Sequence, residues 1–115
     1  MPYIEVGSRQ IEVDEDGFLK NPQDWDEEVA EALAKNSRFG TPTELTDKHW
    51  EIIKYVRDFY LKESVDPPIN MLEKKVGEIF GQKKVHYDFI EDLFPDGRVK
   101  GICRIAGLPE RTGDR

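Results

Sequence analysis

The longest helical pattern of this chain, at about residues 47–63, decides what the rest can fold into. Thr46 precedes it in the position of an N-cap, and Asp66-Pro67-Pro68 stops it. Its large apolar side chains recur at helical spacing, which is typical of a face packed into a core rather than of a cofactor site: Trp50, Ile53, Val56, Phe59 and Tyr60. The pattern predicts a helical core built around this segment.

Shorter patterns on both sides of this helix predict a hairpin and further helices. Residues 3–6 and 10–13 alternate apolar and polar around a turn that contains Gly7, which indicates a β-hairpin over about 3–13. Asp24, with Glu27 three residues later, resembles a capping box and predicts a helix start. The remaining apolar stripes place helices at about 24–35, 69–80, 85–94 and 98–106.

Together these elements predict a mainly α fold. We expect a small orthogonal helical bundle that contains a helix-turn-helix, with an N-terminal β-hairpin and an extended C-terminal arm. A chain of 115 residues has room for one core, which we place in a single domain over residues 1–106. Gly107 and Pro109 end the regular structure, so residues 107–115 are expected to form a flexible arm.

The charge is concentrated near the N-terminus. Residues 1–36 hold ten acidic and three basic side chains and so account for the whole formal net charge of −7. No apolar run approaches the ~20 residues that span a bilayer, and Met1-Pro2-Tyr3-Ile4-Glu5 has no signal-peptide pattern. One cysteine cannot form an internal disulfide, which argues against an extracellular disulfide framework. We expect a cytoplasmic protein that does not insert into membranes.

The helix pair at about 69–80 and 85–94, joined by a short glycine-containing turn, resembles a helix-turn-helix. A second helix that reads DNA would have to bring acidic side chains close to phosphates: Asp88, Glu91 and Asp92. Short turns between helices also occur in ordinary packing. We therefore expect no nucleic-acid binding and keep a contact through this second helix as an alternative.

Metal and self-sufficient catalytic sites are not indicated. The Asp14-Glu15-Asp16-Gly17 turn suggests calcium, but the loop positions that need an oxygen ligand hold Phe18 and Trp25. Zinc needs three or four ligands, and His49, His86 and Cys103 are scattered along the chain. The sequence also lacks a glycine-rich phosphate loop and a nucleophile elbow. We expect no metal and no cofactor, and a carrier or partner protein rather than a free-standing enzyme.

Cys103 is the single cysteine and the candidate reactive group. Lys100 and Arg104 lie next to it along the chain, and nearby cations stabilise the thiolate, which is the nucleophilic form. The alternative is a small buried hydrophobe in a short helix. The residues after Gly107 could extend about 26–29 Å, at about 3.3–3.6 Å per residue. Such an arm could enter a cleft of another protein.

The C-terminal region resembles the signature of the DsrC/TusE family of sulfur-relay proteins, which includes the gamma subunit of dissimilatory sulfite reductase. The matching segments are Leu93-Phe94-Pro95-Asp96-Gly97, Lys100, Cys103, Ile105-Ala106-Gly107-Leu108-Pro109 and Thr112-Gly113. Upstream segments follow in family order: 14–19, Trp25, 44–46, His49-Trp50, Arg57-Asp58, Pro68-Ile69 and Met71-Leu72. The resemblance covers essentially the whole chain.

This resemblance implies a swinging arm with two cooperating cysteines. In DsrC the penultimate cysteine enters sulfite reductase or accepts a persulfide, and the upstream cysteine closes a disulfide or trisulfide with it. Cys103 matches the upstream cysteine, whereas Asp114 stands at the penultimate position, which TusE-type members also keep as cysteine. A carboxylate cannot carry persulfide sulfur. Asn70 also replaces an arginine expected from the family.

The function implied is that of a DsrC-like partner of sulfite reductase or of a sulfurtransferase in dissimilatory sulfur metabolism, monomeric when free. Cys103 is the candidate thiol, with Lys100 and Arg104 as its electrostatic surroundings. The docking arm would use Gly107, Leu108, Pro109, Gly113 and Asp114. The alternative is a regulatory or structural binding module of the same family that transfers no sulfur.

Overall fold

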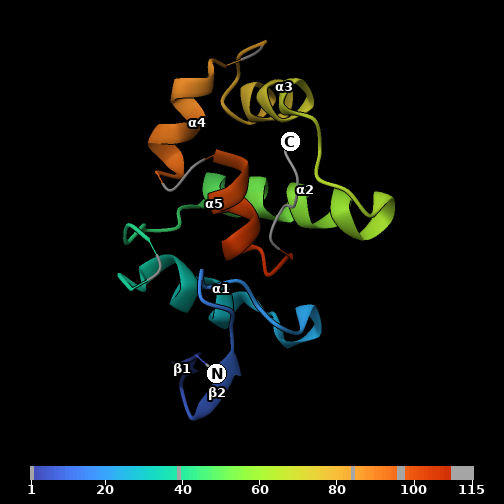
Figure 1. The fold of residues 1–115 in the computed structure, drawn as a ribbon. Helices are drawn as coiled ribbons and strands as arrows, with labels where there is room; N and C mark the ends of the chain where they lie inside the picture. Colours follow the sequence, from blue (N-terminus) through green and yellow to red (C-terminus); the bar gives the residue numbers. More distant parts are fainter. Residues whose placement is uncertain (1, 39, 84, 96–97, 110–115) are drawn as a thin grey trace.

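A short hairpin and a set of packed helices form the protein in the computed structural model, which describes residues 2–38, 40–83, 85–95 and 98–109. The mainly helical fold with an N-terminal hairpin is confirmed (Figure 1). Its elements are β1 (Tyr3–Val6), β2 (Arg9–Glu12), the 3-10 helix η1 (Pro22–Asp24), α1 (Glu27–Lys35), α2 (Asp47–Glu63), α3 (Ile69–Ile79), α4 (Tyr87–Leu93) and α5 (Arg98–Ile105).

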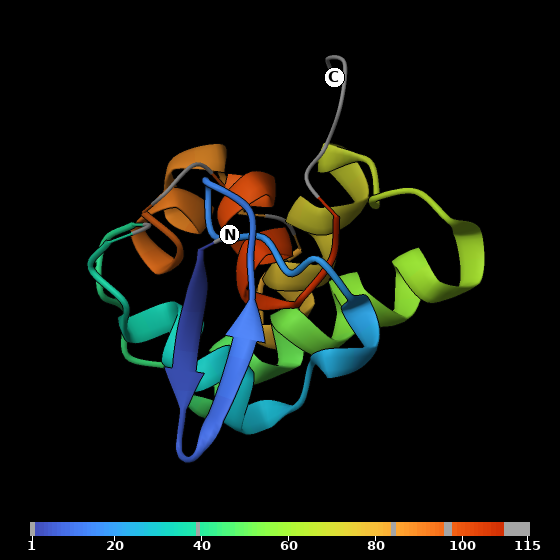
Figure 2. The same ribbon diagram turned by 60° about the horizontal axis from the view of Figure 1, so that its bottom comes forward.

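The hairpin covers one side of α1 (Figure 2). β1 and β2 pair antiparallel, with Tyr3 opposite Glu12 and Val6 opposite Arg9. Their inward side chains form a small core with α1 and with two residues that follow β2: Ile4, Val6, Ile11, Val13, Leu19, Val29 and Leu33. Since two strands alone are marginal in water, this ribbon depends on the helix beneath it.

The start of α1 differs from the expectation. Pro22 begins η1, and Trp25 after it has extended backbone, with φ −76° and ψ 137°. The N-cap therefore lies two residues beyond the predicted one, and the helix begins at Glu27. Asp26, not Asp24, is the N-cap, and its carboxylate accepts a hydrogen bond from the Val29 amide at 2.9 Å.

The N-terminus of α2 is tied to the end of α4 through a histidine. Thr46 caps α2 as predicted, and His49 completes a reciprocal capping box with it. The Nε2 atom of His49 lies 3.0 Å from the carbonyl oxygen of Leu93. His49 is buried, and its ring packs edge-on against Phe94 with 5.1 Å between the ring centres.

Helix α5 lies at the centre of the molecule, in contact with α1, α2 and α4 (Figure 1). Its side chains join those of α2, α3 and α4 in the main core, whose largest buried members include Phe18, Phe94, Ile52, Ile53, Leu72, Ile90, Ile102 and Leu108. Among the described residues, no helix is long and apolar enough to cross a membrane. The C-terminal end of this central helix carries Cys103.

Candidate functional site: the thiol and the base of the arm

The thiol of Cys103 is buried in the last turns of α5, with none of the residue exposed. Its Sγ donates a hydrogen bond to Oδ1 of Asp66 at 3.3 Å. Asp66 lies in the connection between α2 and α3, where two prolines follow it. In this hydrogen bond the sulfur carries its proton, whereas the nucleophilic form of cysteine is the thiolate. In this conformation the thiol is therefore shielded from solvent and from reagents.

The chain leaves α5 through a Schellman motif that includes the cysteine itself. The Leu108 amide donates to the carbonyl oxygen of Cys103 at 3.0 Å, and the Gly107 amide donates to that of Arg104 at 3.3 Å. Gly107 has the left-handed φ of +73° that this motif requires. Gly107 and Leu108 are buried and Pro109 is exposed. The first two residues of the expected arm are thus packed onto the domain.

Two side chains hold the remaining carbonyls at this helix end. The Trp25 indole N–H donates to the carbonyl oxygen of Ile105 at 2.8 Å. The Arg57 guanidinium donates to the carbonyl oxygen of Ala106 at 2.7 Å and to that of Pro22 at 3.2 Å. It also lies over the Trp25 ring, 4.3 Å from the ring centre. We call Trp25 and Arg57 the arm-base clamp.

The clamp is a partly buried cation and aromatic pair. Burial lowers the pKa of Arg57, and the nearby charge of Asp58 acts in the opposite direction. Arginine remains protonated in proteins, so the guanidinium keeps its charge. Its two hydrogen bonds are charge-assisted and therefore stronger than those between neutral groups. This makes Arg57 the strongest single tie on the base of the arm.

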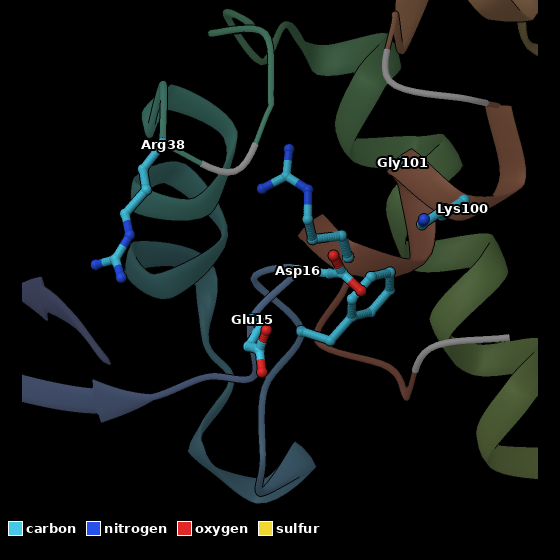
Figure 3. Close-up of a pocket in the computed structure, with 7 residues that line it drawn as sticks. Glu15, Asp16, Arg38, Lys100 and Gly101 are labelled. Atoms are coloured by element: carbon cyan, nitrogen blue, oxygen red, sulfur yellow. The ribbon is translucent and has the colours of Figure 1, made fainter. Parts of the chain in front are cut away.

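The two cations expected around the thiol lie at a hollow of about 330 Å³. Lys100, Gly101 and Arg104 line it from α5, opposite Glu15, Asp16, Phe18 and Arg38. Figure 3 shows Glu15 and Asp16 between Arg38 on one side and Lys100 on the other. Arg104 is buried, and its guanidinium donates to the Leu33 carbonyl oxygen at 2.9 Å. Cys103 does not line this hollow.

Gly113 and Asp114, the other arm residues expected to contribute, lie outside the described residues. Within the described part of the chain, no group of three or more His, Cys, Asp or Glu side chains could hold a metal ion. The three acidic side chains of the second helix of the expected helix-turn-helix, Asp88, Glu91 and Asp92, are exposed. That surface of α4 is unfavourable for a phosphate backbone.

Comparison with known proteins decides the family. The family model described as "DsrC like protein" matches residues 5–113. The chain belongs to the DsrC-like family. The crystal structure of the oxidized gamma subunit of the dissimilatory sulfite reductase (DsrC) from Archaeoglobus fulgidus is 48% identical. It superposes with a TM-score of 0.91, covering 99% of this chain and 100% of the other.

Other members of the DsrC-like family are similar over nearly the same length. The solution structure of Allochromatium vinosum DsrC is 40% identical, with a TM-score of 0.80 over 98% of this chain and 97% of that one. The sulfurtransferase TusE homolog of Haemophilus influenzae is 38% identical over 107 residues, which is 93% of this chain and 94% of that protein. Sulfurtransferase TusE of Escherichia coli K12 is 38% identical over 102 residues, 89% of this chain and 90% of TusE.

For this DsrC-like protein, sequence reasoning identified the thiol but missed its contacts. The sequence indicates Asp66 only as part of a helix stop and Trp25 only as a residue that breaks the calcium pattern and matches the family. The one signal for the clamp was that Trp25 and Arg57 both lie in segments that resemble the family. Their roles depend on contacts with residues 105 and 106, which are far away in the sequence.

Proposed function

We propose that this chain is a sulfur-relay partner protein that acts through Cys103 on other proteins. The observation that carries the proposal is the place of the only thiol, directly at the base of the C-terminal arm in a DsrC-like fold. The 48% identity to the A. fulgidus gamma subunit supports a sulfite reductase as partner. The relatives named sulfurtransferase TusE support a persulfide-carrying donor. The proposal includes a cytoplasmic setting in dissimilatory sulfur metabolism.

The chemical step is a persulfide exchange that needs no cofactor. The Cys103 thiolate attacks the outer sulfur of a partner's persulfide, forming a new S–S bond at Cys103. The S–S bond of the donor breaks, and the donor cysteine leaves as a thiolate. No electrons are gained or lost overall, and the proton of the Cys103 thiol passes to solvent or to a nearby base. Lys100 and Arg104 are proposed to add positive potential around α5 that favours the thiolate.

The test is to incubate the purified protein with a persulfide-loaded sulfurtransferase and to measure its intact mass. We expect the mass of one added sulfur atom, removed by a reductant such as dithiothreitol. Cys103→Ser is the matched control, because it keeps the size of the side chain and cannot form the adduct. If the wild type gains no sulfur although the donor delivers it to a two-cysteine DsrC, sulfur transfer by Cys103 is wrong.

A second candidate is a regulatory or structural member of the family that binds partners without transferring sulfur. The burial of Cys103 and its hydrogen bond to Asp66 favour this alternative, because they describe a thiol used as a core residue. Here Cys103→Ser would bind a sulfite reductase or sulfurtransferase as well as the wild type does. Pull-down of the partner by both forms, read together with the mass assay, separates the two functions.

A further inference from the structure

The buried thiol and the exit of the arm are held by the same few residues. The carbonyl of Cys103 accepts a hydrogen bond from the Leu108 amide. The carbonyls of Ile105 and Ala106 accept hydrogen bonds from the side chains of Trp25 and Arg57 respectively. In a Schellman motif the residue after the left-handed glycine donates its amide to a carbonyl one turn back in the helix. Its side chain often packs against the residue that carries this carbonyl. Here that pair is Leu108 and Cys103, and both are fully buried.

We propose that the arm-base clamp, Trp25 and Arg57, is a latch that controls access to Cys103. While the hydrogen bonds of the clamp are formed, Leu108 stays packed in the core and the thiol stays hydrogen-bonded to Asp66. When it releases, the last turn of α5 can unwind with the arm, and the thiol becomes accessible without unfolding of the rest of the domain. The proposal deepens the sulfur-relay function, because a partner that takes the arm would thereby uncover the thiol.

The geometry makes the latch sensitive to small displacements. Gly107 passes so close to Trp25 that a Cβ added at Gly107 would lie 2.3 Å from Cδ1 of the indole. The guanidinium of Arg57 is stacked on the same ring and holds both the arm base and the Pro22 carbonyl. A partner that moved the Trp25 ring would therefore loosen the Arg57 contacts and the glycine turn together.

The local nature of the opening follows from where the contacts lie. The clamp acts on the last two carbonyls of one helix end, and helix ends are the parts of a fold that open with the lowest free energy. The body of the core, formed by residues such as Ile53 and Ile90, does not have to separate for this to happen. Thiol exposure should therefore depend on the clamp more than on global stability.

The rate of alkylation of Cys103 by iodoacetamide, followed by intact mass, measures this opening directly. Arg57→Gln removes the charge-assisted hydrogen bonds, and we expect alkylation to become about 10- to 100-fold faster. Trp25→Phe keeps a smaller aromatic ring but loses the indole N–H and part of the ring surface, and we expect alkylation to become about 3- to 10-fold faster. Low concentrations of urea should change these rates little, since a local opening exposes little surface.

Ile90→Val is the matched control, because it weakens the core at α4, an element to which neither clamp residue belongs. It should lower the urea midpoint and leave the alkylation rate within about twofold of wild type, as for an opening that does not require global unfolding. If Arg57→Gln and Trp25→Phe are alkylated at the wild-type rate, the latch is wrong. It is also wrong if the rates of all three variants follow their global stabilities. If Arg57→Gln does not fold, Trp25→Phe alone decides between these outcomes.

The alkylation assay uses no persulfide and no partner, so it is independent of the proposed sulfur transfer. If the clamp variants are alkylated faster but neither they nor the wild type gain a sulfur atom, the latch is supported and the relay function is rejected. If the wild type gains a sulfur atom but the clamp variants are alkylated at the wild-type rate, the relay function is supported and the latch is rejected.

Discussion

At the scale of single residues, Cys103 contacts its surroundings through both its sulfur and its backbone carbonyl. Its sulfur donates to Asp66, and its carbonyl accepts the amide of Leu108. In the first contact the sulfur is the hydrogen-bond donor, and the second closes the turn through which the chain leaves the helix. A substitution of the residue therefore tests only the thiol, whereas the path of the arm has to be tested at Gly107.

Gly107→Ala is expected to destabilise the protein strongly. A non-glycine residue in the left-handed region costs about 1–2 kcal/mol, and the new methyl group would overlap the Trp25 side chain at 2.3 Å. Gly81→Ala is the matched control, since Gly81 has a similar φ of +76° and no atom within 4 Å of the added Cβ. Urea unfolding should show the larger loss for Gly107→Ala. Equal losses would mean that the contact with Trp25 is not tight.

At the scale of elements, the helices were predictable because their signals are local. The range 47–63 coincides with α2, whose cap, apolar stripe and proline stop all lie within the helix or directly beside its ends. The start of α1 was misplaced because Asp24 and Asp26 both carry a capping side chain. Only the 3-10 turn begun by Pro22 decides between them, and local spacing does not reveal that turn.

The cap of α1 predicts a pH dependence of stability. Hydrogen bonds from the Val29 amide and from the Arg9 guanidinium lower the pKa of Asp26 below its ordinary value of 3.8. The stabilisation is therefore fully present above that value and is lost as the pH falls through the lower pKa of the folded state. Because the Asp26 side chain is 49% exposed, solvent screening keeps the effect below about 1 kcal/mol.

Asp26→Asn isolates this contribution, because asparagine caps helices as well as aspartate does and carries no charge. Urea midpoints measured from about pH 6 to pH 2, across the ordinary aspartate range, should fall less steeply for Asp26→Asn than for wild type. Asp24→Asn removes the same charge from a residue that does not cap α1, and its profile should follow the wild type. Parallel profiles for wild type and Asp26→Asn would contradict the assigned role.

At the scale of the whole molecule, what the sequence could not predict is the set of contacts between distant segments. The clamp joins the turn before α1, the middle of α2 and the end of α5, across sequence separations of 80 and 49 residues. Likewise, the sequence places Arg104 next to Cys103 as part of its electrostatic surroundings, but it does not reveal that the Arg104 guanidinium donates to the Leu33 carbonyl of α1.

The same long-range packing brings the first residues of the expected arm into contact with the core. The expected boundary is after Ala106, where the glycine and proline pattern begins, yet Leu108 is among the largest fully buried side chains. It belongs to the main core together with residues of α2, α3 and α4. The first residues of the expected arm should therefore contribute to global stability.

Leu108→Ala is expected to lower the free energy of unfolding by about 2–5 kcal/mol, as for other large-to-small changes in a core. Pro109→Ala is the matched control at the next position, which is exposed, and should change stability by less than about 0.5 kcal/mol. Urea denaturation followed by tryptophan fluorescence would report both, since Trp25 lies at the affected contact. Equal stabilities of the two variants would show that Leu108 belongs to the arm and not to the core.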